Sequence, residues 1–233
     1  MSPARREDLA QALGNAAGEP GKVQPLKRGR HKLSAEAVRA SQRERMMAAA
    51  IELVAENGYE KTNVRQIVSR ARVSFSAFSQ AFDDKAGCFL SACERSADEL
   101  LTEMYRAAGA TSWIEAVRTG TVAYLQWWEE HPSFARAYFL GMPLAGSEIS
   151  ERGRNYDGYR TMFAALGMRA RQEQPELPPL REIVPSAIVH AVANVVRDQV
   201  RDNQPLLPLC DSVIYLVVKL LADEATAHAA IKG

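Results

Sequence analysis

The sequence predicts an all-α protein, and three observations carry this prediction. Beyond residue 33, apolar side chains recur at i, i+3, i+4 and i+7, which is the spacing of one face of an α-helix. No stretch shows the strict alternation of apolar and polar residues that is typical of a half-buried β-strand. Breaks such as Asn57-Gly58 and Gly141-Met142-Pro143 divide the periodic stretches into lengths that suit helices of globular proteins.

The first 33 residues lack this periodicity. They contain several glycines and prolines and end in the basic run Lys27–Lys32. We therefore expect a mobile tail over residues 1–33 that ends in a basic arm. Two helical domains are expected to follow, over residues 34–85 and 86–233.

Two helices and a short third helix are expected in the first of these domains. The first begins at Ser34, a favoured N-cap residue, and ends at Gly58, because glycine adopts the left-handed conformation at low cost. Thr62 is the expected cap of the second helix. Ser74 is the expected cap of the third, after a short break in the pattern.

The second domain is expected to be a helical bundle. Asp83 or Asp84 caps its first, long helix. Later helices are expected over Trp113–Glu130, from Pro132 to Gly141, and over Glu148–Gln172, Leu180–Asp202 and Leu209–Ala230. The last two are apolar on more than one face and need a second cover. This pattern predicts a homodimer whose two-fold interface contains four helices.

Charge is distributed unevenly along the chain. Residues 1–85 carry 15 Lys and Arg against 10 Asp and Glu, a net charge of +5, whereas residues 86–233 carry 14 against 18, a net charge of −4. A basic front suits a polyanionic partner. The three cysteines form no disulfide framework, and we find neither a signal-peptide core nor an apolar run long enough to cross a bilayer. We expect a cytosolic protein that has no membrane partner.

The first three helices describe a helix-turn-helix over residues 46–85, because the second and third are short and are joined by a tight turn. In this motif the first two helices brace the third, which enters the major groove of double-stranded DNA. The apolar positions that supply the brace are Met47, Ile51, Val54, Val64, Ile67, Val68, Phe78 and Phe82.

Residues 48–89 resemble the DNA-binding domain of the TetR family. The matching features are Gly58-Tyr59, Thr62-x-Val64-x-x-Ile67, Ala71-x-Val73-Ser74 and Phe78-x-x-x-Phe82-x-x-Lys85. The basic arm is similar to one seen in some actinobacterial members. The resemblance implies a homodimer that reads a pseudo-palindrome, and a small-molecule pocket in the C-terminal helices. Ligand binding would then release the DNA, and most members are repressors.

The family pattern also assigns a DNA face. Thr62 and Lys85 would hold phosphates, and Gln80 is the candidate for a base edge because Gln can pair bidentately with adenine. Arg28 and Arg30 belong to the arm, which is a candidate for the minor groove. The other residues assigned to this face are Ser74, for which capping is the favoured role, Phe75, Ser76, Ala77 and Ser79.

Three residues depart from the family pattern. Arg72 stands where the family usually has glycine, so it is expected to be strained or to shift the turn. Ser79 replaces a tyrosine whose hydroxyl reaches phosphate. Phe75 replaces a polar or basic residue. It either packs on thymine methyl groups or staples the start of the helix onto the core, and the staple is the favoured interpretation. The basic arm would compensate for a third helix that has no cation.

Aromatic residues cluster in the middle of the chain, where most are expected to fill core space. The pocket implied by the family would form among the same helices, with apolar walls and a few polar groups. The candidate ligand-binding residues are Tyr124, Trp128, Tyr138, Phe139, Met142, Tyr159, Phe163 and His190. For His190, a place in the core or at a subunit interface is favoured over a ligand contact.

No catalytic, cofactor or metal pattern stands out. Histidines and cysteines are scattered, and for Cys88 and Cys93, which are five residues apart, core packing is favoured over redox sensing. The chain is therefore expected not to be an enzyme and to need no cofactor. Two alternatives remain open: a helical small-molecule binder or enzyme without specific DNA recognition, and a binder of DNA in general. The effector, the operator, the regulated genes and the sign of regulation are not determined by the sequence.

Overall fold

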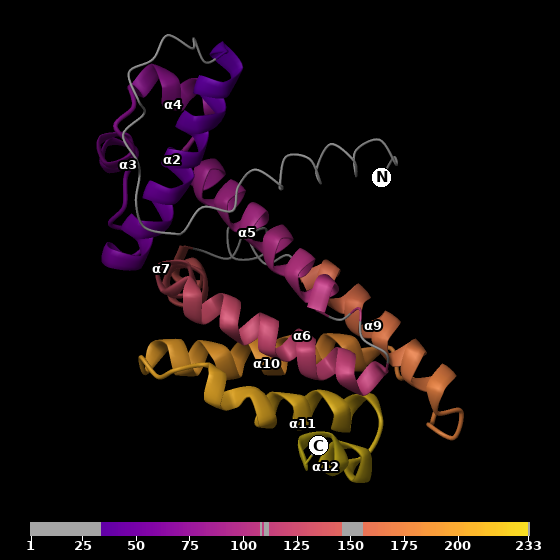
Figure 1. Ribbon diagram of the computed structural model, residues 1–233. Helices are drawn as coiled ribbons and strands as arrows, with labels where there is room; N and C mark the ends of the chain where they lie inside the picture. The colour runs from indigo at the N-terminus through magenta and orange to yellow at the C-terminus, as the bar shows by residue number, and fades with distance from the viewer. Residues whose placement is uncertain (1–33, 108, 110–111, 146–155, 233) are drawn as a thin grey trace. The chain divides into compact units, whose positions relative to one another are not determined.

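Helices make up the regular elements of the structure, a computed structural model that describes residues 34–107, 109, 112–145 and 156–232 (Figure 1). No strand occurs in these ranges, which confirms the all-α prediction for them. The basic arm with Arg28 and Arg30 lies outside the described residues, as do residues 148–155 of a predicted helix. Residues 35–233 form one unit by their contacts, and the expected domain boundary after residue 85 stays a prediction.

The first four helices are the predicted helix-turn-helix and the long helix that follows it: α2 (Ala35–Asn57), α3 (Val64–Ala71), α4 (Phe75–Ala81) and α5 (Lys85–Ala107). The bundle that follows contains α6 (Trp113–Glu130), α7 (Pro132–Arg136), the π-helix η1 (Ala137–Gly141), the 3-10 helices η2 (Met142–Ala145) and η3 (Leu207–Leu209), α9 (Tyr156–Glu173), α10 (Ile183–Arg201), α11 (Cys210–Leu221) and α12 (Glu224–Lys232). Helix α5 joins the two groups, because it packs against both α2 and α6.

Local hydrogen bonds explain where the first helices begin and end. Helix α2 stops before Gly58, which has a left-handed φ of 82° and donates its N–H to the Val54 carbonyl at 2.9 Å. Ser74 accepts the N–H of the third residue of α4 at 3.1 Å, and Asp84 accepts that of the third residue of α5 at 2.7 Å. These predicted caps are confirmed.

The predicted cap of α3 was wrong. Asn63, one residue after Thr62, accepts the N–H of Gln66 at 3.0 Å, and the Gln66 side chain accepts the N–H of Asn63 at 2.9 Å. This reciprocal pair is a capping box. Thr62 turns inward instead: its side chain is 1% exposed, and its hydroxyl donates to the Gly58 carbonyl at 2.9 Å.

Two arginines of α2 close the carboxyl ends of the shorter helices. Arg45 donates to the Ala71 carbonyl of α3 at 2.9 Å, and Arg43 donates to the Ala81 carbonyl of α4 at 3.3 Å. The last carbonyls of a helix lack partners within it and form the negative end of its dipole, so a cation there contributes about 0.3–1 kcal/mol. Helix α2 therefore fixes both α3 and α4 in addition to packing on them.

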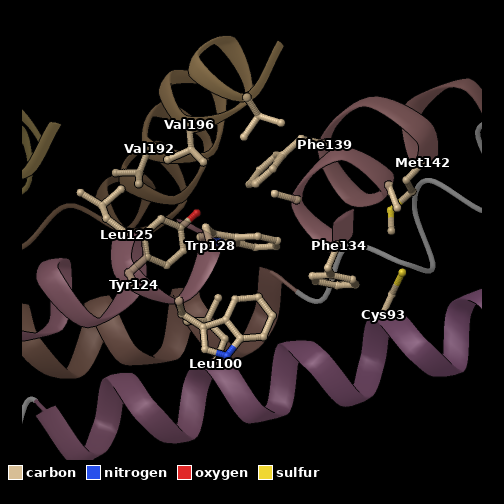
Figure 2. Packing of buried hydrophobic residues seen from close by; sticks show 14 of the residues in the cluster. Cys93, Leu100, Tyr124, Leu125, Trp128, Phe134, Phe139, Met142, Val192 and Val196 are labelled. Atoms are coloured by element: carbon tan, nitrogen blue, oxygen red, sulfur yellow. The ribbon is translucent and has the colours of Figure 1, made fainter. Parts of the chain in front are cut away.

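The bundle also packs directly on α2, through α7 and η1. The two are in close contact at Gly141, where a Cβ atom would lie 2.5 Å from Cγ1 of Val54. No larger side chain fits there unless Val54 moves. The core of the bundle packs against α5 and is filled by aromatic and aliphatic side chains, among them Trp128, Phe134 and Leu100 (Figure 2).

Two predicted helices of the bundle are interrupted. The helix predicted from Pro132 is α-helical to Arg136 and then widens into the π-helix η1. The helix predicted over Leu209–Ala230 is two helices, because Asp223 accepts the N–H of Thr226 at 2.8 Å and so starts α12. Apolar spacing continues across this break, so the periodicity gives no sign of it.

Arg72 lies in the left-handed region, with φ 53° and ψ 51°. The turn nonetheless closes as a glycine turn would, since Val73 donates its N–H to the Val68 carbonyl at 3.1 Å. A side chain with a Cβ atom costs about 1–2 kcal/mol in this conformation. The turn between α3 and α4 is therefore in place but strained.

The variant Arg72→Gly is expected to raise the free energy of unfolding by about 0.5–1 kcal/mol, because the relief of strain exceeds the added backbone entropy of glycine. Denaturant titration followed by circular dichroism measures this change. Arg72→Ala, which keeps the Cβ atom, is the matched control and should not raise stability. An equal gain in both variants would show that the arginine side chain, and not the backbone conformation, is the source of the cost.

Candidate DNA-reading face and ligand cavity

Helix α4 has one buried and one exposed face. Phe78 is buried against the ring of Phe82, which follows the helix, with the ring centroids 5.6 Å apart. The exposed face carries four of the predicted DNA-binding residues: Phe75, Ser76, Ser79 and Gln80. Ala77, which was also predicted, is half-buried beside them. This arrangement holds the helix from beneath and leaves its outer face accessible.

The predicted staple at Phe75 was wrong. The residue is 53% exposed, so its ring does not pack into the core. Phe78 and Phe82 occupy the core beneath α4 instead. Phe75 instead presents apolar surface to solvent on the first turn of the predicted reading helix.

Hydrogen bonds within α4 hold two of its polar side chains. Gln80 donates from Nε2 to the Ser76 hydroxyl at 3.1 Å, and the Ser79 hydroxyl donates to the Phe75 carbonyl at 3.2 Å. The sequence of α4, FSAFSQA, contains no charged residue. The exposed face is therefore neutral, with one amide, two hydroxyls and one aromatic ring.

The two residues predicted to hold phosphates are engaged with the protein. Thr62 is buried and already bonded, so the structure does not place it on the exposed face. Lys85 donates to the Tyr59 carbonyl at 2.8 Å, and its Nζ lies 3.9 Å from the centroid of the Tyr59 ring. Burial lowers the pKa of Lys85 and raises that of Tyr59 to about 12. Lys85 thus anchors the start of α5 and is only half-buried, so a phosphate would have to share its ammonium group.

A cavity of about 50 Å³ lies among α5, α6, η1, α9, α10 and α11. Six of the eight predicted ligand-binding residues line it: Tyr124, Trp128, Tyr138, Phe139, Tyr159 and Phe163. The prediction missed eight lining residues, which come from five helices: Met104, Thr121, Tyr156, Val189, Val192, Ala193, Val213 and Val217. Tyr156 belongs to the aromatic cluster of the sequence, whereas the valines repeat like any core positions and carry no separate signal.

Two predicted cavity residues lie elsewhere. Met142 is fully buried but does not line the cavity, because it follows the π-helix turn that carries Tyr138 and Phe139. His190 is exposed, with its ring centroid 5.0 Å from that of Tyr156, so it is not a core histidine. Its neighbour Val189 faces the cavity instead.

Aromatic rings form the cavity wall next to η1. The Trp128 ring centroid lies 4.6 Å from that of Phe139 and 6.2 Å from that of Tyr124, which in turn contacts Tyr159 edge to face at 6.5 Å. Figure 2 shows Tyr124, Trp128 and Phe139 converging, with Val192 of α10 beside them. Such ring pairs add about 0.5–1.5 kcal/mol each beyond their buried area.

The cavity is electrically neutral. Its described lining contains no Asp, Glu, Lys, Arg or His, and burial raises the pKa of Tyr124, Tyr138 and Tyr159 above the ordinary value. The indole N–H of Trp128 opposes this rise at Tyr124. Although this N–H lowers the pKa of Tyr124, it forms no hydrogen bond with any acceptor in the described part of the chain. The cavity therefore offers hydroxyls and a buried indole donor within apolar walls.

The two cysteines considered for redox sensing lie in the core. Cys88 and Cys93 are fully buried, and burial raises the pKa of Cys88 to about 12 and that of Cys93 further. A thiol of such pKa is protonated near neutral pH and reacts slowly. In the described ranges we also find no cluster of side chains suited to a metal ion and no helix long and apolar enough to span a membrane.

Comparison with known proteins identifies the amino-terminal part of this fold. Residues 46–92 match the family model of bacterial regulatory proteins of the tetR family. These residues are a TetR-family domain. The match covers α3 and α4 entirely and parts of α2 and α5, so the TetR resemblance is confirmed. No curated protein matches the chain.

Solved structures of TetR-type regulators share the fold over most of the chain. The fatty acid degradation regulator FadR of Bacillus halodurans superposes with a TM-score of 0.69 at 18% identity, over 75% of this chain and 97% of its own. FadR of Bacillus subtilis, solved with stearoyl-CoA, gives the same values. A TetR-family regulator of Syntrophomonas wolfei gives 0.67 at 14% identity, over 78% and 95% of the two chains. The fold is therefore shared well beyond residues 46–92, over about three quarters of the chain.

Proposed function

We propose that this TetR-type regulator is a repressor that binds a two-fold symmetric operator as a homodimer and leaves it when a small molecule fills the cavity. The observation that carries the proposal is the exposed face of α4, held from beneath by Phe78 and Phe82. A helix braced in this way has the dimensions and accessibility to enter a major groove. Candidate contacts on α4 are Phe75, Ser76, Ala77, Ser79 and Gln80.

The dimer interface is proposed to lie on α10 and α11. Ile183 is 70% exposed, Val195 lies exposed three turns further along α10, and Leu216 and Leu220 of α11 are only half-buried. A second copy of the chain would cover this apolar surface. The same interface would accommodate His190, which is exposed on α10, and the two-fold axis would pair the two reading helices.

The operator is best sought by selecting bound sequences from a random DNA pool and footprinting the chosen site over a salt series. The expected result is a two-fold symmetric site that holds two copies of the chain, counted by native mass spectrometry. Gln80→Ala should weaken binding to this site by about 30-fold or more, since one bidentate contact is lost in each half-site and each is worth roughly 1–3 kcal/mol. Binding that falls steeply with salt and shows no preferred sequence would support the general DNA-binding alternative.

The ligand is proposed to be uncharged in the part that enters the cavity. A buried ion without a partner costs far more than apolar contacts return, and the described lining offers it no counter-charge. The Trp128 N–H and the tyrosine hydroxyls would hydrogen-bond a polar atom of the ligand. An acyl chain like that of the stearoyl-CoA bound by the Bacillus subtilis FadR satisfies the requirement, as do other apolar groups.

Two rigid probes of the same shape test the neutrality of the cavity. 1-Adamantanol is expected to change the tryptophan fluorescence saturably, and adamantane-1-carboxylate to bind at least tenfold more weakly, because its charge would be desolvated. Ala193→Leu fills the cavity and should abolish the change, whereas Ala191→Leu on the same helix lies outside the lining and should not. Equal affinity for both probes would contradict the proposal.

The π-helix η1 is proposed to transmit ligand binding in the cavity to the reading head, by which we mean the helix-turn-helix of α2, α3 and α4. Tyr138 and Phe139 of η1 line the cavity, and Gly141 at its end touches Val54 of α2. Helix α2 in turn holds the ends of α3 and α4 through its two arginines. A ligand that displaces the η1 rings would therefore press on α2 and tilt α4.

Gly141→Ala imitates this pressure, because the new Cβ atom would lie 2.5 Å from Cγ1 of Val54. We expect operator affinity to fall about fivefold or more without ligand, as overpacking typically costs 1–3 kcal/mol. The second change Val54→Ala removes Cγ1 and should restore affinity. Loss of thermal stability with unchanged operator affinity would show that the contact is structural and does not transmit the signal.

A further inference from the structure

Phe75 is an exposed aromatic residue on a helix face that otherwise carries only hydroxyl, amide and methyl groups. It is 53% exposed and is the largest apolar side chain on the outer face of α4. The exposed part of the ring is apolar area in contact with water, and a partner that covers it gains free energy in proportion to the area covered. The partner has to be one that reaches the face where Ser76 and Gln80 lie.

We infer that Phe75 reads the C5-methyl group of a thymine in the major groove, and this inference rests on the proposed function. The thymine methyl is the apolar group that base pairs present in that groove, and an aromatic side chain is a suitable contact for it. The ring lies on the first turn of α4, and the amide of Gln80 lies on the same exposed surface.

The composition of α4 strengthens this assignment. The helix has no Lys or Arg to pair with guanine and no acidic residue to accept from cytosine. Among its exposed side chains, the ring of Phe75 and the amide of Gln80 have the strongest base preferences, and both favour A·T pairs. The operator half-site should therefore contain a thymine whose methyl group contributes to affinity, separate from the base that Gln80 reads.

The experiment replaces each thymine of the selected operator by uracil, one symmetric pair at a time, which removes the C5-methyl group and nothing else. With the full chain, one pair of positions is expected to lose roughly fourfold in affinity for each methyl group, as its transfer from water predicts, or about 15-fold for both half-sites. The other thymines should be neutral or affect binding in a way that does not depend on Phe75.

The variant Phe75→Ala completes a double-mutant cycle, in which the ring of the protein and the methyl group of the DNA are removed separately and together. It should bind the thymine operator about as weakly as the wild type binds the uracil operator, and uracil at that pair should cost it nothing further. Because Phe75 is exposed, the variant should melt at an unchanged temperature, which shows that it is folded. Ser79→Ala, one turn further along the same face, is the matched control and should keep the full uracil penalty.

Three outcomes would overturn the inference. If the wild type binds its selected operator tightly and no uracil replacement weakens it, Phe75 does not read a methyl group although the proposed function stands. The same holds if Phe75→Ala retains the uracil penalty. If no sequence is selected at all, the proposed function fails and this inference fails with it.

Discussion

Helix α2 is the element on which the remainder of the structure depends, because the short helices α3 and α4 and the helical bundle all pack against it. Met46 and Ala50 are fully buried, and the contacts of α2 extend to α3, α4, α5, α7 and η1. Its arginines also bind the carbonyl ends of α3 and α4. Because a close-packed interior transmits strain, a shift at one end of this helix also strains the contacts at its other end.

One close contact of this packing lies between Gly141 and Val54. It joins η1, whose preceding residues form a wall of the cavity, to the helix that positions α4. π-Helical turns cost hydrogen-bond geometry and occur often at functional sites. In this chain the π-helix carries Tyr138 and Phe139, which line the cavity, and ends at Gly141, which lies against α2.

Neutral surfaces characterise both sites. The outer face of α4 has no charge, and the described lining of the cavity has none either. In the reading head, Arg70 is held by Glu56 through two hydrogen bonds of 2.7 Å, and Arg43 and Arg45 are used as helix caps. These three arginines thus stabilise the domain, and the outer face of α4 presents hydroxyl, amide and apolar groups.

The sequence by itself determined the features that local chemistry encodes. Apolar spacing predicted the helices, with α6 at its observed bounds, and the caps at Ser74 and Asp84 follow from side chains that bond to the backbone three residues on. The TetR resemblance arose from residues within one motif. Six cavity residues were predicted because large aromatic side chains at helical spacing gather wherever several helices meet.

Only the tertiary structure decided which way individual side chains face. Threonine and asparagine are both favoured at the N-cap of a helix. Thr62 is buried and bonded to Gly58, so Asn63 caps α3 instead. Phe75 is exposed whereas Phe78 and Phe82 occupy the core beneath α4, and His190 faces outward because Val189 takes the cavity side of α10. These outcomes depend on neighbours distant in the chain, whereas a sequence pattern reports only on residues within a few turns of one another.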